Sequence, residues 1–286
     1  MNHKILKYFI NVFNIYKMEL GEVYTAIVKS WINADVIKDV NEVKKKHADI
    51  SKYIETKKTV NTRKVQYQAL TAVLKQSKAP AKIINMYSEA STLLAQEAEK
   101  AMGDNQVKES RKKHYKTFDE LLELRDQLKN IDRNYTEELF YIIVCFNTMI
   151  PPRRTELINT KICSEKDVGN CIVKNKWYIT EYKTKKTYGD YETTIPKELM
   201  TILKASLKKY PREYILTQTE DRKKPMAYST LWGLLYAFLG KGQSIDTLRS
   251  AYVSKNLPNL SYNETEELAR QMATSVKMLN LAYRKL

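Results

Sequence analysis

The chain has 286 residues, a formal net charge of +16 and a sequence pI near 9.5. Hydrophobic residues make up 43% of it, which excludes a disordered basic protein, and the length suffices to bury one or two cores. The basic excess lies in both halves and favours a long polyanion as partner, because each neutralised phosphate releases a counterion. No run approaches the roughly 18 apolar residues of a membrane span, so we expect no membrane partner.

Residues 1–17 make a poor signal peptide, and the cysteines agree with an intracellular protein. Cys145, Cys163 and Cys171 are odd in number and lack metal-ligand spacing, which suggests a reducing compartment. None of the 7 glycines builds a phosphate-cradling loop. The 3 histidines all lie in the first 114 residues. We therefore expect no metal and no cofactor. Any chemistry in the part of the chain after residue 114 must work without a histidine side chain.

The first part of the chain has apolar residues at helical spacing. The pattern predicts helices over 19–34, from Thr62 to Gln76, and over 83–102, with a strongly basic connection at 43–58. We expect a bundle of four or five helices, followed by a solvated basic linker at 111–116.

The second part predicts a mainly helical domain with a small antiparallel sheet. Two strands, 171–184 and 191–196, flank a lysine-rich turn at Gly189-Asp190. The predicted domains are an N-terminal segment at 1–18, a helical domain at 19–115 and a further domain at 116–286. Helices are expected over 117–128, 136–150, 153–158, 196–210, 229–240, 244–257, 263–273 and 275–286.

Two basic clusters in this second part have a functional and an ordinary interpretation. Arg153 and Arg154 follow Pro151-Pro152 and open a predicted helix, so they form either a bidentate anion clamp or a solvated surface pair. The lysine-rich hairpin carries either a proton donor into a DNA groove or a charged tip that keeps it soluble.

Arg249 and Tyr283 lie in otherwise apolar helical patterns. A buried arginine needs a partner, and either a glutamate or helix end, or a phosphate, would serve Arg249. Tyr283 is 1 of 20 tyrosines, and core packing is the ordinary role of a tyrosine on an amphipathic helix. The case for a further role rests on the order of these groups along the chain.

That order resembles the tyrosine recombinase (phage integrase) family. The motifs are Arg153 with Glu156, a lysine hairpin ending at Ile195-Pro196, Leu248-Arg249, and Tyr283 within Ala282-Tyr283-Arg284. The Pro-Pro-Arg-Arg form of the first motif resembles integrases of large DNA viruses and their mobile elements. The resemblance covers residues 117–286 at motif level. Residues 19–115 match only in kind, as the helical (SAM-like) core-binding domain that clamps DNA.

The resemblance implies a DNA breaking-rejoining fold with a set of catalytic roles. Arg153 and Arg249 would hold the phosphate, Tyr283 would be the nucleophile, and Lys183 would be the catalytic lysine, with Lys186 as its rival. Two positions depart from the family pattern. Asp246 stands where the family usually has histidine, and Thr274 stands where it usually has histidine or tryptophan. Asp246 would be paired with Arg249 or protonated, and Thr274 would donate to a phosphate oxygen.

The implied function is site-specific recombination or integration of double-stranded DNA through a 3′-phosphotyrosyl intermediate. The implied assembly is a homo-tetramer on DNA and a monomer or dimer when free, with residues 1–18 either joining copies or packing on their own domain. The expected location is the nucleus or virus factory of a host cell if the source is viral, and otherwise the cytoplasm. Expected DNA contacts are Arg63, Lys64, Arg111, Lys112, Lys113, Arg154, Lys185 and Lys186.

Two alternatives stay open. A type IB topoisomerase uses the same phosphotyrosine chemistry to relax DNA as a monomer. A non-catalytic DNA-binding protein on an integrase scaffold would also explain the sequence, and Asp246 and Thr274 favour that interpretation.

Overall fold

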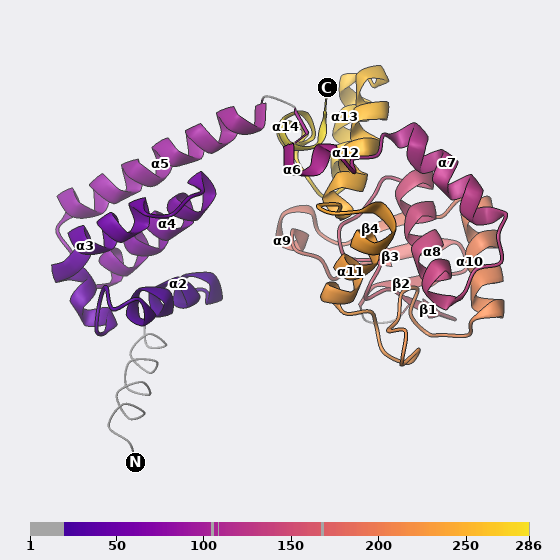
Figure 1. The fold of residues 1–286 in the computed structure, drawn as a ribbon, viewed down its shortest axis with the longest axis horizontal. Helices are drawn as coiled ribbons and strands as arrows, with labels where there is room; N and C mark the ends of the chain where they lie inside the picture. The colour runs from indigo at the N-terminus through magenta and orange to yellow at the C-terminus, as the bar shows by residue number, and fades with distance from the viewer. Residues whose placement is uncertain (1–19, 104–105, 108, 167–168, 286) are drawn as a thin grey trace, which may run out of the picture. The chain divides into compact units, whose positions relative to one another are not determined.

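The computed structural model describes residues 20–103, 106–107, 109–166 and 169–285. The chain divides into two compact units, with the boundary between Met102 and Gly103 (Figure 1). The segment 1–18, which we expected to join copies or pack on its own domain, lies outside the described residues.

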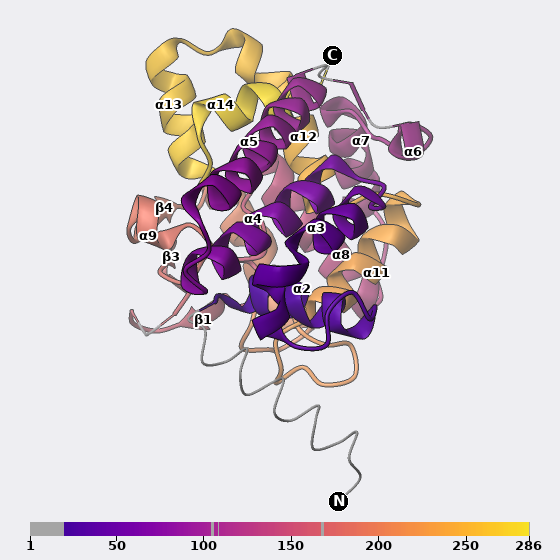
Figure 2. The ribbon, with the colours of Figure 1, turned by 90° about the vertical axis from the view of Figure 1, so that its left-hand side faces the viewer.

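Helices alone build the first unit as the structure describes it (Figure 2). The basic stretch that we expected as a connection is itself a helix, because Val43, Ile50 and Ile54 bury one face of it and leave its lysines outside. In the core, Nε1 of the fully buried Trp31 donates to Oε1 of Gln66 at 3.2 Å. The elements are α2 (Glu22–Asn33), η1 (Val40–Glu42), α3 (Val43–Glu55), α4 (Val60–Gln76) and α5 (Ala81–Gly103).

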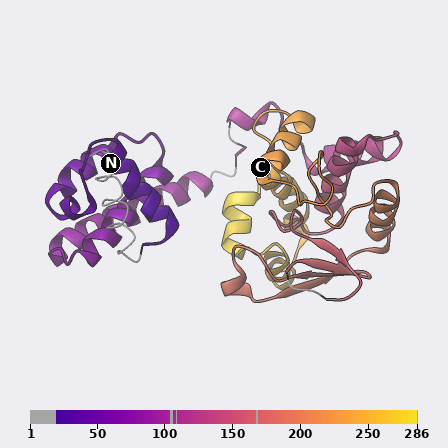
Figure 3. The same ribbon diagram turned by 90° about the horizontal axis from the view of Figure 1, so that it is seen from below.

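The second unit is mainly helical and carries a four-stranded mixed sheet along one edge (Figure 3). The strands are β1 (Lys161–Cys163), β2 (Cys171–Val173), β3 (Lys176–Ile179) and β4 (Tyr191–Thr194), in that order across the sheet. β1 pairs parallel with β2, whereas β2–β3 and β3–β4 are antiparallel. The expected sheet was antiparallel throughout, so β1 is an addition to it.

The helices of this unit surround α8 (Tyr135–Met149), which is buried over most of its length because an unbroken run of aliphatic, aromatic and cysteine side chains fills residues 139–146. Capping boxes formed by Thr117 and Asn134 cap the N-termini of α7 (Phe118–Lys129) and α8. The other helices are α6 (Glu109–Lys112), α7 (Phe118–Lys129), α9 (Lys185–Tyr188), α10 (Lys197–Lys209), α11 (Tyr228–Leu239), α12 (Ile245–Asn256), η2 (Leu257–Asn259), α13 (Tyr262–Gln271), α14 (Val276–Met278) and the π-helical turn η3 (Leu279–Tyr283).

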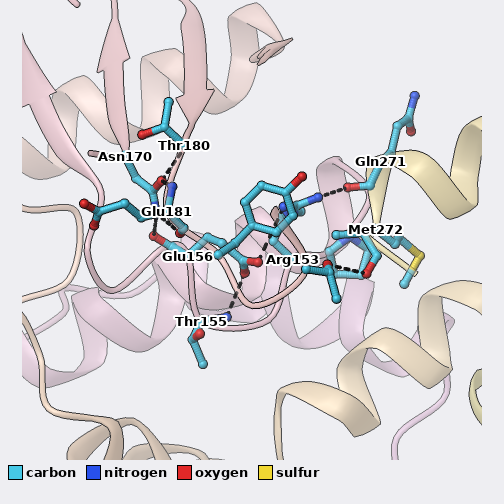
Figure 4. Close-up of polar contacts among 12 residues, drawn as sticks. Arg153, Thr155, Glu156, Asn170, Thr180, Glu181, Gln271 and Met272 are labelled. Carbon is cyan, nitrogen blue, oxygen red and sulfur yellow. Dashed lines mark hydrogen bonds and ion pairs between the residues drawn. The ribbon is translucent and has the colours of Figure 1, made fainter. Parts of the chain in front are cut away.

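The lysine segment is not the predicted hairpin turn. The first predicted strand contains a tight turn of its own at Lys174, where φ is 56°, and it therefore splits into β2 and β3. Beyond β3, the Asn170 side chain accepts hydrogen bonds from the amides of Thr180 and Glu181, which ends the ladder (Figure 4). The segment after it forms the short helix α9.

Two further expectations were wrong at this level. Residues 153–158 form turns rather than a helix: the Ile158 amide bonds the carbonyl of Thr155, and the Thr160 amide bonds that of Leu157. The basic run at 111–116 belongs to the second unit and is not a linker at the end of the first. The His114 ring packs directly on Gly240, where an added Cβ would meet it at 2.5 Å.

Among the described residues, no helix is long and apolar enough to cross a membrane. Within that same part of the chain, no group of three or more His, Cys, Asp or Glu residues could hold a metal ion.

Candidate active site

Tyr283 lies at the end of η3 and is buried, with 3% of its surface exposed. Nη2 of Arg154 donates to its hydroxyl at 2.8 Å, and the hydroxyl donates to Oδ1 of Asp246 at 3.4 Å. The guanidinium of Arg249 lies 4.6 Å from the centre of the phenol ring. Three charged side chains, one from Arg154 and two from α12, therefore surround one phenol.

Asp246 is held in the first turn of α12, which a capping box between Ser244 and Thr247 begins. Its Oδ1 lies 3.8 Å from Nε of Arg154 and 3.9 Å from Nε of Arg249. Burial acts to lower the pKa of Arg154, but the hydrogen bond to Tyr283 and the charge of Asp246 together raise it. The carboxylate is thus balanced by two guanidiniums while its side chain stays 56% exposed.

Arg249 on α12 is fully buried, and backbone carbonyls hold it, one of them at the end of helix α13, which is one of the partners that the sequence left open. Its Nη1 donates to the Pro152 carbonyl at 2.7 Å and its Nη2 to the Met272 carbonyl at 3.0 Å. Among the described residues, no acceptor bonds its Nε. Burial lowers the pKa of this guanidinium, but arginine stays charged in proteins. The site therefore keeps a buried positive charge whose Nε–H has no hydrogen-bond acceptor among the described residues.

Arg153 is buried, and its described polar contacts are with Glu156 and Gln271 (Figure 4). Its Nη1 donates to the Gln271 carbonyl at 2.8 Å, and its Nη2 lies 3.5 Å from Oε1 of Glu156. The rings of Tyr182 and Tyr191 lie 4.7 and 5.4 Å from its guanidinium. Its described contacts thus join it to Glu156 and the end of α13, whereas its neighbour Arg154 contacts Tyr283.

A cavity of about 230 Å³ opens beside Asp246, and Lys183 and Arg154 also line it. Lys185, on α9, pairs with Asp190 at 2.8 Å, and the exposed Lys186 also lies on α9. Of the two rival lysines, Lys183 is thus the one that shares this cavity with Arg154 and Asp246.

Thr274 is buried in the turn after α13, next to the carbonyls that bind the two inner arginines. The Thr184 hydroxyl donates to the Ala273 carbonyl in this turn at 3.3 Å. This contact fixes the lysine segment to the turn that precedes the Tyr283 helix.

The remaining expected DNA contacts lie on both units. On the first, Arg63 is engaged with Glu55 at 3.1 Å and Glu97 at 4.0 Å, and Lys64 is half-buried on α4. On the second, Arg111 is half-buried, Lys112 pairs with Glu109 at 2.8 Å, and Lys113 is exposed.

The sequence motifs did not indicate the aromatic wall of the cavity, which Tyr228 and Trp232 on α11 form. Their spacing of four residues places both on one helix face, and this signal was available from the sequence. The motifs also did not indicate the carbonyls of Gln271 and Met272 as arginine acceptors, because no side-chain pattern marks a backbone acceptor.

No family model matches the chain, and no curated protein matches it. Among solved structures the chain is similar to the XerA recombinase, with 15% sequence identity over 96% of this chain and 91% of that chain, at a TM-score of 0.44.

Proposed function

We propose that this protein is a tyrosine recombinase, which cleaves and rejoins DNA through a covalent bond to Tyr283. The observation that carries the proposal is the hydrogen-bonded chain from Arg154 through the Tyr283 hydroxyl to Asp246, next to the buried charge of Arg249. The order of these residues along the sequence, which resembles the family, supports the same function. The source in a virus or mobile element stays a prediction.

The proposed reaction is a transesterification. The phenol oxygen of Tyr283 attacks a DNA phosphorus, the bond from phosphorus to the 5′ oxygen breaks, and a 3′-phosphotyrosyl ester forms. Asp246 accepts the phenol proton, since its Oδ1 is the acceptor of that hydroxyl. Lys183, across the same cavity, protonates the leaving 5′ oxygen. Rejoining runs the steps in reverse, so the phosphodiester energy is conserved in the ester.

Arg154 and Arg249 are the proposed phosphate ligands. Arg154 is 44% exposed at the cavity, and the Nε–H of Arg249 has no acceptor in the described part of the chain, so both can donate to oxygens that gain charge in the transition state. We assign Arg153 a positioning role, because Glu156 and the Gln271 carbonyl already engage it. This assignment gives Arg154 the phosphate role that the family resemblance implies for Arg153.

The test is covalent trapping on a pool of nicked duplexes of randomised sequence, in which the cleaved fragment diffuses away and prevents rejoining. We expect a protein–DNA band on a denaturing gel that Tyr283→Phe abolishes while leaving DNA binding unchanged. Sequencing the trapped DNA identifies the target.

The same experiment addresses both alternatives. Binding to the pool without an adduct supports the non-catalytic DNA-binding protein. An adduct together with relaxation of supercoiled plasmids that lack any selected site supports the topoisomerase.

A further inference from the structure

Helix α11 exposes aromatic side chains on one face. Tyr228 and Trp232 are 56% and 40% exposed, and their rings lie 6.4 Å apart in an edge-to-face arrangement. Large aromatic side chains at such exposure leave much apolar surface in water, which marks a contact surface more often than a solvated helix face. Of the protein's 3 tryptophans, Trp31 and Trp177 are buried, at 0% and 2%, so Trp232 is the one that a ligand can reach.

The same two rings form one side of the cavity at the candidate active site. Buried Leu231 and Leu235 continue the apolar side, while Arg154 and Lys183 bring positive charge to the cavity. Two carboxylates also line it, but Glu156 lies 3.5 Å from Arg153, and Asp246 lies within 4 Å of two arginines. The cavity thus combines flat aromatic rings with cationic side chains that can bind an anion.

From this combination we infer that the cavity receives an unstacked nucleotide of the DNA strand, with its base against Trp232 and its phosphate at Arg154 and Lys183. The cavity of about 230 Å³ suits a single base rather than a peptide segment. Every base has a π-face, so stacking on an aromatic ring tolerates any sequence. The inference rests on the proposed function only in identifying that phosphate with the one that Tyr283 attacks.

The experiment compares the binding of two single-stranded oligonucleotides of 12 residues. One is oligothymidylate, and the other is an abasic strand with the same phosphates, so a difference between them reports a contact to the base. The full chain is used, with intrinsic tryptophan fluorescence and the anisotropy of an end-labelled strand as readouts. We expect the thymidylate strand to quench the fluorescence and to bind more tightly than the abasic strand, which leaves the fluorescence unchanged.

Variants at α11 locate the effect. Trp232→Ala weakens thymidylate binding about tenfold and leaves abasic binding unchanged, because one stacked base contributes on that order. Trp232→Phe keeps the affinity and loses the quenching, since the other tryptophans are buried. Tyr236→Ala is the matched control: Tyr236 is 58% exposed on the same helix but does not line the cavity, so both readouts stay at the wild-type level.

Equal affinity of the wild type for both strands, with no quenching, would overturn the inference. It would also be overturned if Trp232→Ala changed self-association in sedimentation velocity without DNA and left thymidylate binding intact, because the face would then join two copies. Covalent trapping separates the two proposals: normal adducts without quenching reject the stacked base alone, and quenching without adducts rejects the recombinase chemistry alone.

Discussion

Arg153 and Arg154 are adjacent in the chain but have opposite surroundings. Arg153 has a side chain 3% exposed between Glu156 and a backbone carbonyl, whereas Arg154 is 44% exposed and donates to Tyr283. They stand just before a turn and not in a helix, and their side chains have separate partners. Their substitutions should therefore act on different quantities, one on stability and the other on rate.

Arg154→Ala should slow adduct formation roughly 10²-fold, because one lost donor to a developing oxyanion costs about 3 kcal/mol. Its thermal midpoint should stay close to that of the wild type. Arg153→Ala should lower the free energy of unfolding by about 3–5 kcal/mol, because Glu156 is then left buried without its partner. Adduct kinetics and thermal melts of both variants check this, and the reverse pattern would return the phosphate role to Arg153.

Asp246→Asn should slow adduct formation by about 10²-fold, since an amide cannot accept the phenol proton. The fold should persist, because the side chain is 56% exposed and its charge only balances the arginines. Asp119→Asn, an exposed acid paired with Lys255, serves as the control. A wild-type rate in Asp246→Asn would exclude the carboxylate as the proton acceptor.

At the scale of elements, a buried ion pair joins α7 to α8. Nε of Arg133 donates to Oε2 of Glu138 at 2.8 Å, and its Nη1 bonds the Leu128 carbonyl at the end of α7. The guanidinium lies 4.1 Å from the Tyr141 ring, and Glu138 is 3% exposed. Arg133 thus satisfies a helix end and a buried carboxylate together.

Arg133→Ala should lower the free energy of unfolding by about 3–5 kcal/mol, because it leaves Glu138 charged and unpaired in the core. The apolar double variant Arg133→Met, Glu138→Leu should recover most of that loss. Lys255→Ala removes an exposed pair and should change stability by less than about 1 kcal/mol. Urea unfolding of the three variants measures the difference.

Periodicity in the sequence predicted most helices, since their apolar residues recur on one face. It failed at α3, where lysines outnumber the three buried aliphatic residues. It also failed at 153–158, where the Arg153 side chain bonds the Gln271 carbonyl and the short helical pattern does not form a helix. Motif order indicated that Arg249 and Tyr283 meet. It could not decide between Arg153 and Arg154, because Glu156 and the Gln271 carbonyl direct these side chains only in the folded state.

At the scale of the whole molecule, the two units have separate hydrophobic cores, one around Trp31 and Leu70 and the other around α8. Predicted DNA cations lie on both. The family resemblance implies an assembly of four copies on two duplexes. In such an assembly each copy would cut one strand, which requires that the candidate site lie within one chain.

A fragment beginning at Gly103 should bind duplex DNA more weakly than the full chain and with a shallower dependence of log affinity on log salt. Fewer phosphates are neutralised once the first unit is removed, so fewer counterions are released. Adduct formation should persist at saturating DNA, because the residues around Tyr283 all belong to this unit. Anisotropy titrations at several salt concentrations measure the slope, and an identical slope would mean that the first unit touches no phosphate.

Arg153 and Arg249 grip consecutive carbonyls, those of Gln271 and Met272, just ahead of the segment that bears Tyr283. These two hydrogen bonds hold the segment that leads to Tyr283, the proposed nucleophile, against arginines of the same chain. Both hydrogen bonds would have to break before a subunit could place its Tyr283 in the active site of a neighbour. Under the proposed chemistry, we therefore expect each subunit to cut with its own Tyr283, in cis.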